Sequence, residues 1–257
     1  MAAILQTHSV GICFGGLKAV QDLNLTLNEG DLVGLIGPNG AGKTTVFNLL
    51  TGIYLPTTGD IIFKGESIVG LKPYQIAAKG ITRTFQNIRL FGELSVLENV
   101  LIARHLHVPY NMMHAIFRLG KFYQGEKEMR DEAYELLKIM NLAHKAEEKA
   151  KNLPYGEQRR LEIARALATH PSLLLLDEPA AGMNPRETTE LMELISFIRS
   201  KFNVTILLIE HDMHLVMNIC EQIYVLDYGV NIAHGTPEEI KNNPRVIEAY
   251  LGEGAYL

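Results

Sequence analysis

A glycine-rich stretch from Gly37 to Thr45 has the residue types needed to bind phosphate. It fits the pattern G-x-x-x-x-G-K-[ST]. Glycines let the backbone fold into a concave set of N–H donors, because no Cβ blocks the turn. Lys43 adds a positive charge for the outer phosphates, and the Thr44 hydroxyl suits Mg²⁺. The predicted binding residues are Gly37, Pro38, Asn39, Gly40, Ala41, Gly42, Lys43, Thr44 and Thr45.

The segments on either side supply the elements that such a site needs. Asp31–Ile36 is a short apolar run typical of a buried strand. Lys43–Leu50 is predicted to form a helix, which Gly52 prevents from continuing. A helix that begins at the phosphate adds unpaired N–H groups and a partial positive charge. The alternative is an ordinary glycine turn, which this strand-to-helix setting makes the weaker interpretation.

Two adjacent acids, Asp177 and Glu178, follow a second apolar run at 172–176, which is too short for anything except a buried strand. His211 follows another such run, Val204–Ile209. In open α/β sheets, ligands bind outside the carboxyl ends of the strands. We therefore expect Asp177 and His211 to lie at the same edge of the sheet as the phosphates, although a purely structural histidine is an equal alternative.

Short strands with one buried face are predicted near the N-terminus. Leucine alternates with polar residues over Leu23–Asn28, and Ile61–Phe63 follows a turn. Together with residues 4–13, these segments indicate an antiparallel sheet beside the core. Phe14 is expected in a loop of that sheet, where it either stacks on a purine base or packs in the core.

The composition changes from β-rich to helical at Gln86. Ser95–Glu98 is a capping box that opens a helix, and Glu126–Met140 has the apolar spacing of another. We expect one domain in two parts: a helical subdomain over 87–155, and a nucleotide-binding core over 1–86 and 156–257.

Overall composition narrows the class of protein. The chain has 257 residues, 47% hydrophobic content and a formal net charge of -5, with no basic run, so we expect no nucleic-acid partner. Cys13 and Cys220 are isolated, which favours buried thiols in a reducing compartment. No apolar run approaches the roughly 18 to 20 residues of a membrane span. We expect a cytoplasmic protein that reaches a membrane only through a partner.

The order of these motifs resembles the ATP-binding subunit of ABC transporters over essentially the whole chain. The matching segments are Gly37–Thr45 (Walker A), Gln86 (Q-loop), Leu153–Gln158 (signature), Leu173–Glu178 (Walker B), Ala181–Asn184 (D-loop) and His211 (switch histidine). The resemblance implies an α/β P-loop NTPase of ABC type, with a mixed sheet core, an antiparallel β subdomain and an inserted helical subdomain. It also implies ATP and Mg²⁺ as cofactors.

The resemblance implies a set of contacts that hold Mg²⁺ and ATP. Phe14 stands where the family's aromatic residue stacks on adenine, with Val20 beside it. Thr44 and Asp177 would hold the metal, Asp177 through water. Gln86 would touch the metal and report to the membrane subunit.

The catalytic residues implied by the resemblance are Lys43, Gln86, Glu178 and His211. Glu178 would polarise the attacking water, and His211 would contact the γ-phosphate and help to place that water. These roles are coherent physically, since phosphoryl transfer depends on positioning and charge neutralisation more than on covalent chemistry.

The signature segment would face ATP held by another subunit, and here it departs from the family pattern. Pro154 replaces the usual serine, Tyr155 the first glycine and Glu157 the glutamine, while Gly156 is kept. Pro154 offers neither a hydroxyl nor an N–H to the partner's ATP. Asn184 likewise replaces the usual D-loop aspartate.

Details outside the shared motifs resemble the branched-chain amino acid importer ATPase, notably Cys13–Val20, the helical insert and the ending Asn243–Gly252. The implied partners are a second ABC ATPase subunit, either a copy or a homologue, two membrane permease subunits and, indirectly, a periplasmic or extracellular solute-binding protein. The alternatives are an ATPase of a lipopolysaccharide-extracting system and, in a different class, a soluble ABC protein acting on ribosomes or DNA.

Overall fold

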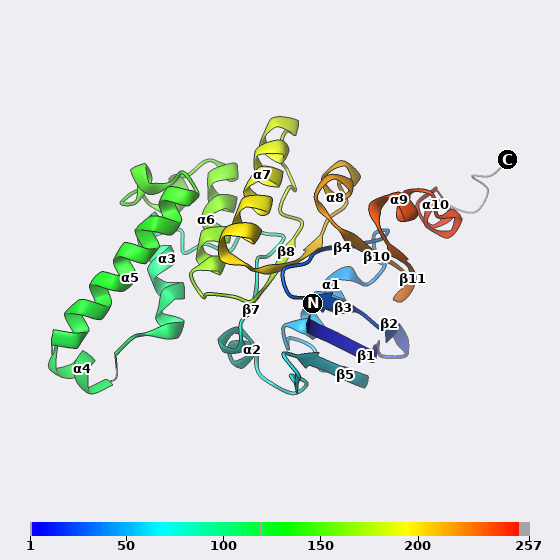
Figure 1. The fold of residues 1–257 in the computed structure, drawn as a ribbon, viewed down its shortest axis with the longest axis horizontal. Helices are drawn as coiled ribbons and strands as arrows, with labels where there is room; N and C mark the ends of the chain where they lie inside the picture. Colours follow the sequence, from blue (N-terminus) through cyan, green and yellow to red (C-terminus); the bar gives the residue numbers. More distant parts are fainter. Residues whose placement is uncertain (1, 111, 119, 252–257) are drawn as a thin grey trace. The chain divides into compact units, whose positions relative to one another are not determined.

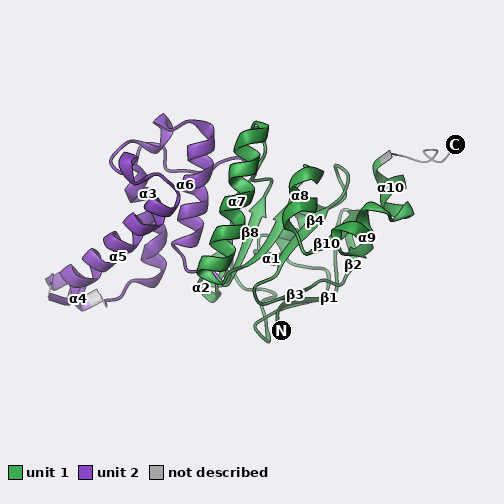
Figure 2. Ribbon diagram, turned by 45° about the horizontal axis from the view of Figure 1, so that its top comes forward, with its two compact units in different colours: residues 1–86, 172–257 green, residues 87–171 purple. Residues whose placement is uncertain are grey.

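The computed structural model describes residues 2–110, 112–118 and 120–251. Its contacts divide the chain into two compact units, residues 1–86 with 172–257, and residues 87–171 (Figure 2). The first unit contains both sheets, and the second is helical. Gly252, at the end of the C-terminal segment that resembles the importer ATPase, lies outside the described residues.

The larger sheet carries the expected buried strands. In the described part of the chain it has six strands in the order β11-β10-β4-β9-β8-β7 (Figure 1). These strands are β4 (Leu32–Ile36), β7 (Ile81–Arg83), β8 (Leu173–Asp177), β9 (Thr205–Ile209), β10 (Gln222–Asp227) and β11 (Val230–Gly235). All neighbours are parallel except β10 and β11. Since β4, β8 and β9 are completely buried, their sequences are continuous apolar runs, and their carboxyl ends meet at one edge.

The smaller sheet is antiparallel, as expected. Its described strands are β1 (Ala3–Phe14), β2 (Leu17–Leu23), β3 (Thr26–Asn28), β5 (Thr58–Phe63) and β6 (Glu66–Ser67). The leucines at 23, 25 and 27 are all buried, but they do not form one strand, because β2 ends at Leu23. The backbone turns there, with Asp22 at φ 46°, and the Thr7 hydroxyl bonds to both Leu23 O and Leu25 N.

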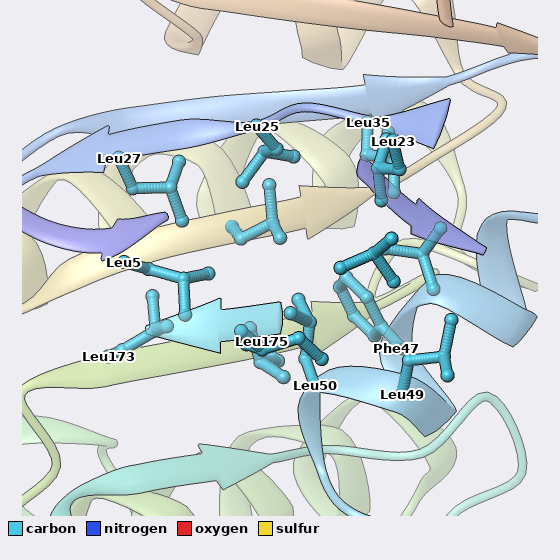
Figure 3. Close-up of a cluster of buried hydrophobic side chains, with 14 of the residues drawn as sticks. Leu5, Leu23, Leu25, Leu27, Leu35, Phe47, Leu49, Leu50, Leu173 and Leu175 are labelled. Carbon is cyan, nitrogen blue, oxygen red and sulfur yellow. The ribbon is translucent and has the colours of Figure 1, made fainter. Parts of the chain in front are cut away.

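Helix α1 (Lys43–Leu50) packs between the two sheets, at the bounds that its sequence predicts. Figure 3 shows Phe47, Leu49 and Leu50 of this helix among leucines from both sheets. Each fully buried side chain of this size stabilises the fold by about 1.5 to 3 kcal/mol. This packing fixes the start of α1, and with it the loop that precedes the helix.

The other face of the larger sheet carries α7 (Pro185–Phe202) and α8 (Met213–Ile219) (Figure 1). Asn184 caps α7, accepting hydrogen bonds from the N–H groups of Arg186 and Glu187. Helices α2 (Pro73–Lys79), α9 (Pro237–Lys241) and α10 (Pro244–Leu251) complete the described helices of this unit.

The helical unit extends to residue 171 rather than to the expected boundary at 155. Helix α6 (Tyr155–Leu167), which we had assigned to the core, packs against α3 (Val96–Arg104) and α5 (Gly120–Ile139). The α3 capping box is present, since Ser95 and Glu98 exchange side-chain and backbone hydrogen bonds. The other described elements of the unit are α4 (Met112–Phe117) and three short 3₁₀ turns, His105–His107, Ala143–Lys145 and Ala150–Asn152. Among the helices of the described residues, none has the length and apolar character to cross a membrane.

Candidate nucleotide-binding site

The loop between β4 and α1 is shaped by its glycines and by Lys43. A Cβ on Gly37 would lie 2.0 Å from the carbonyl oxygen of Leu226, so only glycine fits there. Gly40 has φ +82° and borders open space. Lys43 Nζ donates hydrogen bonds to the carbonyls of Gly37, at 2.7 Å, and Pro38, at 2.9 Å. The ammonium group is therefore held against the loop's own backbone.

The start of α1 is suited to an anion. In the described structure, no side chain caps this helix and its first turn carries no acid. Its first N–H groups and the positive end of its dipole therefore stay available for a phosphate. The hydroxyl-bearing Thr44 is exposed at this position.

Lys43 is within electrostatic range of the two acids at the carboxyl end of β8, Asp177 and Glu178. Burial lowers the pKa of its ammonium group, while the carboxylates of Glu178 and Asp177 raise it. The structure thus brings Asp177 and Glu178 into electrostatic range of the loop, as the sequence predicted from their place at the end of a buried strand.

Asp177 is almost completely buried and has a partner that sequence reasoning missed. Arg83 Nη2 lies 2.6 Å from Asp177 Oδ2, with the two side chains 6% and 3% exposed. The sequence does show a charged residue, Arg83, within the β-rich run that forms β7. It does not show which acidic side chain would pair with that residue. Since the pair uses only one carboxylate oxygen, Oδ1 is left out of it.

Glu178, Gln86 and His211 form a cluster at the edge of the sheet. Gln86 Nε2 donates to Glu178 Oε2 at 2.9 Å, and His211 Nδ1 lies 3.6 Å from the same oxygen. The Glu178 side chain is 19% exposed, so water can reach it. Glu178 has φ 45°, a conformation that costs a non-glycine residue energy and that is concentrated at functional sites.

Glu210, directly before His211, is a second residue that sequence reasoning did not single out. Its carboxylate is buried and accepts hydrogen bonds from the N–H groups of Ala180, at 2.8 Å, and His211, at 3.1 Å. Burial raises the pKa of this carboxyl group. Glu210 therefore ties the segment after β8 to the segment after β9.

Comparison with known proteins identifies the chain. A family model described as "ABC transporter" matches residues 20–181, more than half of the sequence. The chain belongs to the ABC transporter ATP-binding family. It is an ATPase of this family, and a second model, "Branched-chain amino acid ATP-binding cassette transporter", matches residues 230–256.

Individual relatives of this cassette align over nearly their whole length. The chain is 52% identical to the high-affinity branched-chain amino acid transport ATP-binding protein BraF of Pseudomonas aeruginosa, over 97% of this chain and 98% of BraF. It is 51% identical to LivG of Escherichia coli K12, with the same coverage. Among solved structures, it is similar to the ADP conformation of an ATP-binding cassette (TM-score 0.85, 32% identity) and to a nucleotide-free cassette (TM-score 0.84, 34% identity), in both cases over 98% of this chain and 100% of the other.

The predicted adenine-stacking residue of the cassette is accessible. Phe14 is 42% exposed and makes an edge-to-face contact with Tyr54, their ring centroids 5.1 Å apart. It is the last residue of β1 rather than a loop residue, and its exposure excludes the plain core aromatic. Val20 is buried, and a Cβ on Gly42 would lie 3.6 Å from its Cγ2, so Val20 adjoins the start of α1.

The signature segment of the cassette opens α6 in the helical unit. Pro154 is the N-cap and supplies no side-chain hydrogen bond, consistent with the loss of the usual serine. Tyr155 is 45% exposed, and Glu157 forms an ion pair with Lys145 at 2.6 Å. Gly156 lies between them in the first turn of the helix.

A cavity of about 680 Å³ adjoins the outer residues of the nucleotide loop. It is lined by Pro38, Asn39, Gly40, Ala41, Asp227, Tyr228, Ile232, Arg245, Glu248 and Ala249. The C-terminal helix α10 thus borders the loop, and Tyr250 of this helix accepts a hydrogen bond from the backbone of Gly37.

Proposed function

We propose that this ABC ATPase is the motor subunit of an importer of branched-chain or similar hydrophobic amino acids, and that it uses ATP with Mg²⁺. The observation that carries the proposal is the meeting of Lys43, Asp177 and Glu178 at one edge of the sheet, where their charges act on one another. The choice of solute rests on the names of the relatives, together with the match of residues 230–256 to a branched-chain transporter model.

The residues around the loop fit a nucleotide with Mg²⁺. The loop backbone and Lys43 would hold the β- and γ-phosphates. Thr44, Gln86 and Asp177 offer hydroxyl, amide and carboxylate oxygens, the hard donors that Mg²⁺ prefers. Bound there, the metal would supply neutralisation of phosphate charge. Phe14 and Val20 would hold the adenine.

Hydrolysis requires a water molecule placed in line with the γ-phosphate. Glu178 would orient that water, since its carboxylate lies near the loop and Arg83 pairs with Asp177 instead. Gln86 and His211 contact or approach Glu178 Oε2, so they would hold the carboxylate in place. His211 would also reach the γ-phosphate.

In this proposal two cassettes sandwich two nucleotides. The signature residues Pro154, Tyr155, Gly156 and Glu157 of one subunit face the ATP of the other, which is a second copy or a homologous ATPase. The pair works on the cytoplasmic face of the cell membrane, attached through two permease subunits that receive solute from a periplasmic or extracellular binding protein. We propose no nucleic-acid partner.

Titration of the purified chain with ATP tests the nucleotide site. Lys43→Ala removes the phosphate-binding charge and is expected to abolish tight binding, whereas Lys241→Ala, at an exposed lysine of α9, is the matched control. Full affinity in the Lys43 variant would refute the site. Copurification from the native membrane tests the transport assignment, which predicts permease subunits and a branched-chain amino acid binding protein in the complex.

A further inference from the structure

Arg83 occupies a position that no motif assigns. Its guanidinium carbon lies 5.3 Å from the ring centroid of Phe47 and 5.4 Å from that of Phe85. The side chain is only 6% exposed. The guanidinium group therefore lies against two aromatic rings, one from α1 and one from the segment that leads to Gln86.

The hydrogen bonds of Arg83 join two parts of the nucleotide site. Nη1 donates to Asn48 Oδ1 at 2.7 Å, and Nη2 donates to Asp177 Oδ2 at 2.6 Å. Nε is buried without a hydrogen-bond partner in the described structure. Arg83 thus links α1, which follows the phosphate loop, to the acid that ends β8, at the cost of one unsatisfied donor.

Asp177 interacts with two cations, one in direct contact and one at longer range. Arg83 contacts it directly, while Lys43 lies close enough for the Asp177 charge to raise its pKa. A buried carboxylate needs a compensating charge. The hydrogen bonds of Lys43 go to the loop carbonyls of Gly37 and Pro38. Without Arg83, the uncompensated charge of Asp177 would act more strongly on Lys43, and an ammonium group drawn toward Asp177 is less available to a phosphate.

We propose that Arg83 is a positioning residue of the nucleotide site, which holds Asp177 and thereby keeps Lys43 available for phosphate before a metal ion arrives. This inference rests on the proposed function, since it needs phosphate at Lys43. It predicts that Arg83 matters most for ATP binding without Mg²⁺. Bound Mg²⁺ would add positive charge beside Asp177, so Arg83 would then matter less for keeping Lys43 available.

Calorimetric titration with ATP, in EDTA and in saturating Mg²⁺, tests the inference. Arg83→Met keeps an unbranched apolar stem between the rings but removes the charge. We expect its affinity in EDTA to fall about tenfold, a size typical of residues in direct contact, and its affinity in Mg²⁺ to fall much less. Equal losses under both conditions would overturn the proposal.

A double-mutant cycle shows whether Arg83 acts through Asp177. In the Asp177→Asn protein, Arg83→Met is expected to leave the ATP affinity measured in EDTA unchanged, because no carboxylate remains to attract Lys43. A loss that persists in this background means that Arg83 acts only by packing, which contradicts the inference. Thermal unfolding of each variant checks its fold, and if Arg83→Met does not fold, Arg83→Lys replaces it in the cycle. Lysine keeps the positive charge but not both planar hydrogen bonds. The ATP affinity of Arg83→Lys in EDTA is therefore expected to fall, but by a smaller factor than that of Arg83→Met.

The Lys43→Ala titration separates this inference from the proposed function. If Lys43→Ala binds ATP normally, both fail. If Lys43→Ala loses binding while the Arg83 cycle shows no coupling to Asp177, the nucleotide site stands and only the role of Arg83 is overturned.

Discussion

The carboxamide of Gln86 donates a hydrogen bond of 2.9 Å to the carboxylate of Glu178. Gln86 is the last residue of the sheet-containing unit before the helical unit begins. The residue that leads into the helical unit is therefore bonded directly to the acid proposed to orient water. A backbone shift at this point would change the position of the Glu178 carboxylate.

Replacing Glu178 with Gln should separate binding from turnover. Glutamine keeps the size of the side chain but loses the charge that orients water. We expect ATP affinity to be kept and kcat to fall by about 100-fold or more, as for a group that acts mainly in the transition state. Phosphate release and ATP titration measure the two effects, with Glu193→Gln, at an exposed position of α7, as the control. An unchanged kcat would assign the water-orienting role elsewhere.

Replacing Gln86 with Glu should shift the pH dependence of hydrolysis. A second carboxylate beside Glu178 raises the pKa of the pair, because like charges disfavour ionisation. Since the ionised form of Glu178 orients water, the acid side of the pH profile of kcat is expected to move to higher pH. Gln86→Ala removes the hydrogen bond without adding a charge, so the midpoint of its profile is expected to move in the same direction by a smaller amount. A Gln86→Glu profile that keeps its midpoint would mean that the contact has no electrostatic role.

The sequence predicted those parts of the site that depend on neighbours along the chain. The loop 37–45 and the helix Lys43–Leu50 follow from local patterns, and Asp177 was placed correctly because it ends a buried run. The pairing of Arg83 with Asp177 could not be predicted in this way. It arises because β7 pairs in parallel with β8, which depends on strand order and register.

The second boundary of the helical unit was missed for a similar physical reason. The apolar face of Tyr155–Leu167 is equally compatible with burial against the sheet and burial against other helices. Only the packing of α6 on α3 and α5 decides between the two. The break in the leucine run between β2 and β3 was likewise hidden, since the alternation of buried leucines at 23, 25 and 27 continues across it.

Alanine substitutions at Gly37 and Gly40 should lower the free energy of unfolding by very different amounts. Alanine at Gly37 would place its Cβ 2.0 Å from the Leu226 carbonyl oxygen, a backbone atom that cannot move aside alone. We expect this variant to lose several kcal/mol or to fail to fold, by the mechanism of overpacking and backbone strain (about 3 kcal/mol or more). At Gly40 the φ of +82° is unfavourable, but a Cβ meets nothing within 4 Å, so the cost is about 1 to 2 kcal/mol. Urea unfolding measures both, and equal losses would contradict the role of the Leu226 contact.

The affinity for ATP should begin to fall at a lower pH than it would if Lys43 had the pKa of an ordinary lysine. Burial lowers the pKa of Lys43 below 10.5, and only the protonated ammonium attracts phosphate. ATP affinity is therefore expected to decline between neutral pH and pH 10.5. The free energy of unfolding of the nucleotide-free protein is expected to change in the opposite direction. It rises with pH through this range, because Lys43 loses its proton and the cost of burying its charge disappears. In Lys43→Arg the charge persists, so the pH-dependent loss of ATP affinity should be absent.

The hydroxyl of Tyr250 should stabilise the nucleotide loop from the C-terminal helix. It accepts a hydrogen bond from the Gly37 backbone, and burial raises the pKa of the phenol. Tyr250→Phe is expected to cost about 1 kcal/mol of unfolding free energy, the net worth of one hydrogen bond. Burial raises the folded-state pKa, whereas the accepted hydrogen bond favours the ionised phenol and lowers it. Stability that depends on the neutral buried phenol is therefore present below pH 10.0 and is lost as pH rises through the folded-state value, while the hydrogen bond is kept. Urea unfolding across that range checks both points, with Tyr123→Phe, at a tyrosine 60% exposed, as the control. No difference between the two variants would mean that α10 does not hold the loop.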